Sequence, residues 1–104
     1  AETELEDFRL EVRTRLIDLQ QQVKRQRRQL SLLDETLLPK AETALETTLS
    51  GYRTGQNDFL DLLDAERTLF QLRLQRASVY TRLLKTQAEW ERTAGRVGLS
   101  NFSD

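Results

Sequence analysis

Carboxylates are the side chains of this chain with the clearest potential for chemistry. Asp61 and Asp64 stand three residues apart, so a helix places both on one face. Repeated around a symmetry axis, such a pair makes a ring that favours cations. Acids in the first turn of a helix are also favoured by the helix dipole alone. The two interpretations are compatible, and the sequence leaves both open.

A second acidic group, Glu2, Glu4, Glu6 and Asp7, could perform acid–base chemistry or bind a hard cation. An exposed first helical turn offers no pocket, so we expect these acids only to mark a helix start. The chain has no Cys, His or Met, which removes the thiolate nucleophile, the imidazole base and the soft metal ligands. We therefore expect no enzymatic activity, no metal site and no cofactor.

The basic residues Lys24, Arg25, Arg27 and Arg28 form one cluster. It could contact phosphate or acidic lipid, but such a run on a long helix more often only solvates one face. A formal net charge of -1 argues against a nucleic-acid partner.

The elements that must position these residues are helices. The chain has 104 residues, enough for one domain, with only 4 Gly and 1 Pro. Apolar residues in the first half recur at steps of three or four, the helical period. They are Leu5, Phe8, Val12, Leu16, Leu19, Val23, Leu30, Leu33, Leu37, Ala41 and Ala44, with a second row at Leu10, Ile17, Leu32, Leu38, Leu45 and Leu49.

Pro39 interrupts the first helix. It cannot donate a hydrogen bond to the carbonyl of Glu35, so one prediction is a kinked but continuous helix. Alternatively, Pro39 opens a separate helix, although Leu38 would be a poor N-cap for it.

The main break comes at residues 50–58, where Gly55 can end a helix in the left-handed conformation and Asn57 or Asp58 can cap the next helix. We predict an all-α fold, a long antiparallel helical hairpin of coiled-coil type over residues 1–104. Its parts are a helix over about 3–53, a tip over 54–57, a helix over 58–95 with Gly95 as its C-cap, and a tail over 96–104. Because the chain opens at Ala1 without an initiator Met, we expect either a processed form or a piece of a larger protein, and we favour the piece.

The second helix repeats in sevens. Its apolar positions fall into three neighbouring heptad rows: Leu62, Leu69, Leu83 and Trp90, with Arg76 as the exception; Leu63, Phe70, Ala77 and Leu84; and Ala65, Leu72 and Val79. We expect Trp90 only to pack. An arc this broad needs a second helical neighbour outside the hairpin. The remaining face is polar: Asp61, Asp64, Thr68, Gln71, Gln75, Ser78, Arg82 and Lys85.

Three tracts resemble the TolC-like outer membrane efflux family, and more closely its heavy-metal efflux branch. They are residues 37–41 (LLPKA), 51–55 (GYRTG) and 58–69 (DFLDLLDAERTL). The resemblance implies that this chain is the second of two helical hairpins in one subunit. In that family, three subunits close into a periplasmic α-barrel that continues into an outer-membrane β-barrel. The β-barrel would be the only part of the protein that contacts the membrane.

The resemblance also implies residue roles. Tyr52, Arg53, Thr54, Gly55 and Gln56 would form the periplasmic tip that latches the closed pore and docks a periplasmic adaptor, which links it to an inner-membrane pump. Asp61 and Asp64 would narrow the pore entrance. Tyr52 could instead be a hydrophobic plug under the turn.

One residue departs from the family pattern. Asn57 stands where well-known members carry a basic latch residue, a role that Arg53 could take instead. The resemblance predicts a gated conduit for metal cations in the cell envelope of a Gram-negative bacterium. The alternative is a structural or adaptor hairpin that scaffolds other proteins.

Overall fold

The computed structural model describes residues 2–96, and these are helical except in one connection. The elements are α1 (Glu2–Leu32), the π-helical segment η1 (Leu33–Leu37), α2 (Leu38–Arg53) and α3 (Phe59–Arg96). No strand occurs within this described range, which confirms the all-α prediction. The chain divides into two compact units, residues 28–80 and residues 1–27 with 81–104.

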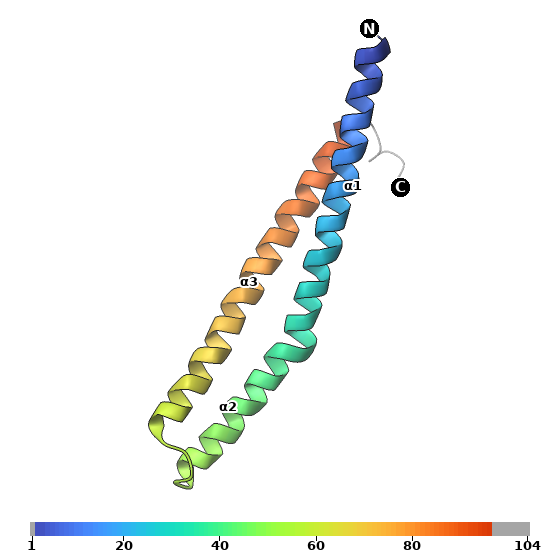
Figure 1. Cartoon of the computed structure of the whole chain (residues 1–104). Coiled ribbons are helices and arrows are strands. Elements are labelled where there is room, and N and C mark those ends of the chain that lie inside the picture. The colour runs from blue at the N-terminus through green and yellow to red at the C-terminus, as the bar shows by residue number, and fades with distance from the viewer. Residues whose placement is uncertain (1, 97–104) are drawn as a thin grey trace. The chain divides into compact units, whose positions relative to one another are not determined.

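The unit of residues 28–80 is an antiparallel helical hairpin. Figure 1 shows α2 and the first half of α3 side by side, joined by the connection at residues 54–58. Apolar side chains from both arms are buried between them: Leu33, Ala41, Leu62, Leu69 and Val79. This seam supplies the unit's core, because burial of apolar area is the main favourable term in helix pairing.

One row of buried and half-buried positions runs the length of α3 at alternating steps of three and four. They are Leu62, Ala65, Leu69, Leu72, Arg76, Val79, Leu83, Thr86, Trp90 and Thr93. These are the steps of a heptad repeat, and we call this row the seam of α3. It contains the first and third of the predicted apolar rows.

The other predicted apolar row of α3 lies largely outside the seam. Phe70 is 61% exposed and Leu84 is 48% exposed, and Ala77 between them is also exposed. All eight residues of the predicted polar face are exposed as well. A pair of helices therefore covers only part of the apolar arc of α3, as its width indicates.

The backbone stays helical through Pro39. Leu37 has φ -73° and ψ -46°, Leu38 has φ -65° and ψ -47°, and no side chain caps the start of α2. The departure from α-helical hydrogen bonding lies one turn earlier, in η1, where the N–H of Leu38 bonds to the carbonyl of Leu33, five residues back. This π-turn widens the helix one turn before Pro39.

The buried row of the first helix changes beyond Leu37. Ala44, which we predicted to continue the apolar stripe, is exposed, whereas Leu45 from the second row is half-buried. The prediction for Ala44 is wrong because the π-turn adds one residue to the helical count and rotates every later side chain.

The second unit pairs the start of α1 with the end of α3. Val12, Leu16 and Ala94 form its buried cluster, and Trp90 packs against them as predicted. Leu19 is fully buried. Arg15 pairs with Glu89 across the seam, and the hydrogen bond to that carboxylate raises the pKa of the Arg15 guanidinium above its usual value.

The predicted C-cap at Gly95 is wrong. Gly95 lies inside α3, which extends to Arg96, and among the described glycines only Gly55 has a positive φ. A glycine ends a helix in this way only where it adopts the left-handed conformation. Apart from Arg96, the predicted tail over 96–104 lies outside the described residues.

We expect truncation of Leu19 to destabilise the chain strongly. Leu19 is 0% exposed, and a buried leucine replaced by alanine costs about 2–5 kcal/mol. Urea unfolding followed by circular dichroism measures the loss for Leu19→Ala. Leu10→Ala is the matched control, since Leu10 is 62% exposed; equal losses for the two variants would contradict this seam.

Candidate functional site

The tip connection is closed by backbone hydrogen bonds onto the end of α2. The carbonyl of Gly51 accepts bonds from the N–H groups of Gln56 at 2.7 Å and Asn57 at 3.1 Å. Gly55 has φ +82°, the left-handed conformation predicted for it, and its N–H donates to the carbonyl of Tyr52. The last carbonyls of a helix need such partners. The tip is thus a defined turn.

Gly51 and Asn57 form a contact that the sequence analysis did not identify. Asn57 Nδ2 donates to the carbonyl of Thr48 at 3.2 Å, which lays the Asn57 carboxamide across Gly51. A Cβ on Gly51 would meet Asn57 Nδ2 at 2.1 Å, so any larger residue there must displace the Asn57 side chain and its hydrogen bond to Thr48. A glycine in the last turns of a helix, followed by Asn six residues later, was the available signal.

The predicted tip residues lie together but differ in what they contact. Tyr52 is 42% exposed and packs edge-to-face on Phe59, with ring centroids 6.3 Å apart. The Thr54 hydroxyl donates to the carbonyls of Ser50 and Gly51, both at 3.2 Å. Arg53 and Gln56 are exposed. Tyr52 and Phe59 therefore form an aromatic pair at the turn that stays about half exposed to solvent.

Asp61 and Asp64 have different local roles. The N–H of Asp61 donates to Asp58 Oδ1 at 2.9 Å, and the N–H of Asp58 donates to Asp61 Oδ2 at 3.3 Å. This reciprocal arrangement is a capping box that starts α3. Asp64 is exposed one turn later and no hydrogen bond to its carboxylate is found among residues 2–96. Asp61 thus helps to start α3, whereas the Asp64 carboxylate takes no part in the capping box.

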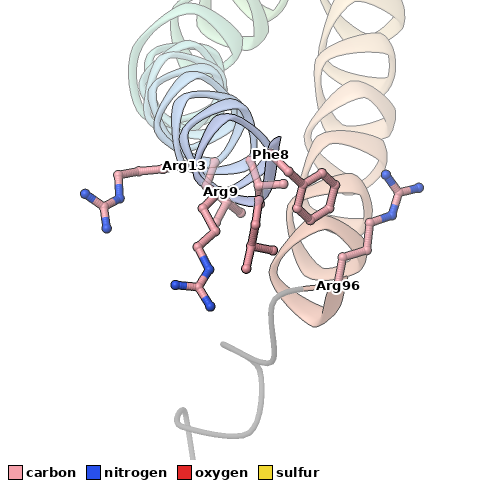
Figure 2. Close-up of a pocket in the computed structure, with 7 residues that line it drawn as sticks. Phe8, Arg9, Arg13 and Arg96 are labelled. Carbon is pink, nitrogen blue, oxygen red and sulfur yellow. The ribbon is translucent and has the colours of Figure 1, made fainter. Parts of the chain in front are cut away.

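An open groove lies at the other end of the chain, in the unit of residues 1–27 and 81–104. It has a volume of about 480 Å³ and is lined by Leu5, Phe8, Arg9, Val12, Arg13, Leu16 and Arg96. In Figure 2 the Phe8 ring lies between the two helices, whereas the side chains of Arg9, Arg13 and Arg96 extend away from one another. Because these guanidinium groups diverge, they form no convergent site for one anion.

The described helices bear on two further functional classes. No helix within residues 2–96 is long and apolar enough to cross a membrane. In the same part of the chain, no three His, Cys, Asp or Glu residues are grouped so that they could hold a metal ion.

Comparison with known proteins finds one similarity to a metal-resistance protein. Over 64 residues the chain is 38% identical to the cobalt-zinc-cadmium resistance protein CzcC of Cupriavidus metallidurans. The match covers 62% of this chain but only 15% of that relative's length. No family model and no solved structure matches the chain.

We expect the effect of Gly51→Ala on stability to have opposite signs in the native chain and in the Asn57→Ala variant. Alanine is normally favoured over glycine inside a helix by about 0.5–1 kcal/mol, but here its Cβ would collide with Asn57. Gly51→Ala should therefore destabilise the native chain and stabilise the Asn57→Ala variant, as measured by thermal unfolding. Gly55→Ala is the control: its positive φ makes alanine unfavourable in both backgrounds.

We expect the two tip aspartates to separate in their effect on stability. Asp61→Ala removes one half of the capping box, and the hydrogen bond that is lost, from the N–H of Asp58, contributes about 0.5–1.5 kcal/mol. Asp61→Asn should recover most of this loss, because its amide oxygen still accepts a hydrogen bond. Asp64→Ala should be near neutral. Urea midpoints compare the three variants, and a loss for Asp64→Ala as large as that for Asp61→Ala would exclude the separation.

Proposed function

We propose that this chain is the periplasmic helical hairpin of an outer-membrane efflux channel subunit and forms part of the wall of a conduit. The observation that carries the proposal is the 38% identity over 64 residues to a cobalt-zinc-cadmium resistance protein. The proposal includes localisation in the envelope of a Gram-negative bacterium, with metal cations as cargo.

The hairpin geometry supports a wall. α3 buries one seam against its partner arm and leaves Phe70 (61% exposed) and Leu74 (55% exposed) uncovered. An apolar strip beside a buried seam is what a helix needs when it contacts a neighbour on each side. In the proposed homotrimer, three subunits close such hairpins into a barrel.

The charge pattern supports an aqueous edge between the apolar flanks. Asp61 and Asp64 are exposed at the tip end of the polar row of α3. Repeated by a threefold axis, they would surround the entrance with carboxylates, which attract cations and repel anions. Residues 2–96 present no metal-binding cluster, so the proposed role is passage of the ions along a charged surface.

The tip supports a docking role. Tyr52, Arg53, Thr54, Gly55 and Gln56 form a turn held by internal hydrogen bonds, with Tyr52 and Arg53 presented to solvent. A turn that is already ordered loses little conformational entropy when a partner binds. We propose that a periplasmic adaptor docks there and couples the conduit to an inner-membrane pump. Repacking of the tip helices would then widen the entrance.

The pore role is tested in the full-length protein that contains this hairpin. The double variant Asp61→Asn with Asp64→Asn keeps the hydrogen-bond acceptors and removes the charge, and it should lower the cation-to-anion permeability ratio several-fold in planar bilayers. Glu66→Gln is the matched control, because Glu66 is an exposed acid outside the polar row. Unchanged selectivity in the double variant would exclude these residues from the constriction.

A scaffold or adaptor hairpin is the alternative, and the sequence of the full-length protein decides between the two. A second, related hairpin together with amphipathic strands supports the channel. Lipoyl-like segments flanking this hairpin support the adaptor.

A further inference from the structure

The two arms of the seam differ by one residue in their repeat. In the first arm, the buried and half-buried seam positions alternate in steps of four and three: Val12, Leu16, Leu19, Val23, Gln26, Leu30 and Leu33. The row then resumes at Ala41, Leu45 and Thr48. From position 33 to position 41 is eight residues, one more than a heptad. The seam of α3 contains no such extra residue between Leu62 and Thr93.

The exposed side chains of α2 confirm the offset. An uninterrupted heptad continued from Leu33 would bury Lys40, Ala44 and Thr47, and all three are exposed. One residue corresponds to a rotation of about 100° around the helix axis. The segment η1 absorbs the extra residue, because its π-turn bonds Leu38 to Leu33 over five residues instead of four.

A charged pair lies at this point of the seam. Arg76 is the one member of its heptad row in α3 that is not apolar, and it reaches Asp34 in η1. Arg76 Nε lies 2.5 Å from Asp34 Oδ1, and Nη2 lies 3.3 Å from Oδ2, a two-point contact. The guanidinium also lies over the ring of Tyr80, 5.6 Å from its centroid.

This pair contributes more to specificity than to stability. Both side chains are 39% exposed, and ion pairs at such positions contribute little to the free energy of unfolding. A leucine at position 76 would bury more apolar area. A polar residue in a coiled-coil seam commonly selects one register among several at some cost in stability.

We propose that the Asp34–Arg76 pair determines where the first arm absorbs its extra residue, and so sets the rotation of α2 against α3. Without the pair, the π-turn can move toward the tip, and the seam of α2 passes from positions 41 and 45 to positions 40 and 44. The side chains between the old and the new position of the π-turn rotate about the axis of α2 by about 100°. This inference does not depend on the channel proposal.

Pro39 is the competing cause. It lacks an N–H and crowds the turn before it, so it could locate the π-turn without help from Arg76. If the pair locates the π-turn, Arg76→Leu should change which positions of α2 are buried. If the proline locates it, Pro39→Ala should do so.

The absence of cysteine from the chain allows a direct measurement in the full 104-residue protein. Four variants, each with a single cysteine, are alkylated with a small reagent and their rates compared: Lys40→Cys, Ala41→Cys, Ala44→Cys and Leu45→Cys. In the native background, the thiols at positions 41 and 45 should react about tenfold more slowly than those at positions 40 and 44, because buried positions react only on local opening.

Arg76→Leu should abolish or invert this difference while circular dichroism shows the helices retained. The charge swap Asp34→Arg with Arg76→Asp should restore slow reaction at positions 41 and 45. Pro39→Ala should leave the native pattern. Arg15→Leu is the matched control, since it breaks the pair with Glu89 in a regular stretch of α1.

The native pattern in Arg76→Leu overturns the proposal, as does an altered pattern in Pro39→Ala alone. If Arg76→Leu loses its helices, the charge swap decides: helices with slow reaction at positions 41 and 45 support the proposal, and any other result overturns it. Deletion of Thr36 removes the extra residue, so in that background Arg76→Leu should leave the pattern unchanged.

Discussion

A helix with one neighbour can bury only one seam, and the described structure depends on this constraint. Along α3, residues at alternating steps of three and four form one row that contains most of its buried core. Apolar residues beyond that seam, such as Phe70 and Leu74, stay exposed because two helices offer nothing to cover them. The geometry of pairing, more than residue type, thus decides which leucines and phenylalanines are core.

Several positions of the buried seam are polar. Thr86 is buried but donates its hydroxyl to the carbonyl of Arg82 at 2.9 Å. Gln26 occupies the gap in the predicted apolar stripe, and its buried Oε1 has no hydrogen-bond partner in the described part of the chain. Arg76 pairs with Asp34. At each of these positions an apolar side chain would bury more apolar area. Arg76 lies opposite η1, where the described first arm has its extra residue.

The tip combines local rigidity with open side chains. Asp58 and Asp61 start α3 with reciprocal hydrogen bonds, and Asn57 closes over Gly51. Asn57 also donates a hydrogen bond to the carbonyl of Thr48, which ties the turn to the last turns of α2. The charge of Asp61 and its role in the capping box are separate properties, because an Asp61→Asn substitution removes the charge and keeps the hydrogen-bond acceptor.

The sequence by itself determined the all-α fold, the hairpin connection, the left-handed Gly55 and the polar row of α3, because helical periodicity and turn chemistry are local. It also identified Arg76 as an exception, but not its partner. Tertiary structure decided three things: the π-turn before Pro39, which exposes Ala44 and half-buries Leu45; the Asp34–Arg76 pair; and the closure of Asn57 over Gly51. The Asp34–Arg76 pair joins residues 42 apart in the chain, so no local pattern could specify it. The π-turn and the Asn57 contact are closer in sequence, but their geometry follows from how the two arms pack and how the turn closes.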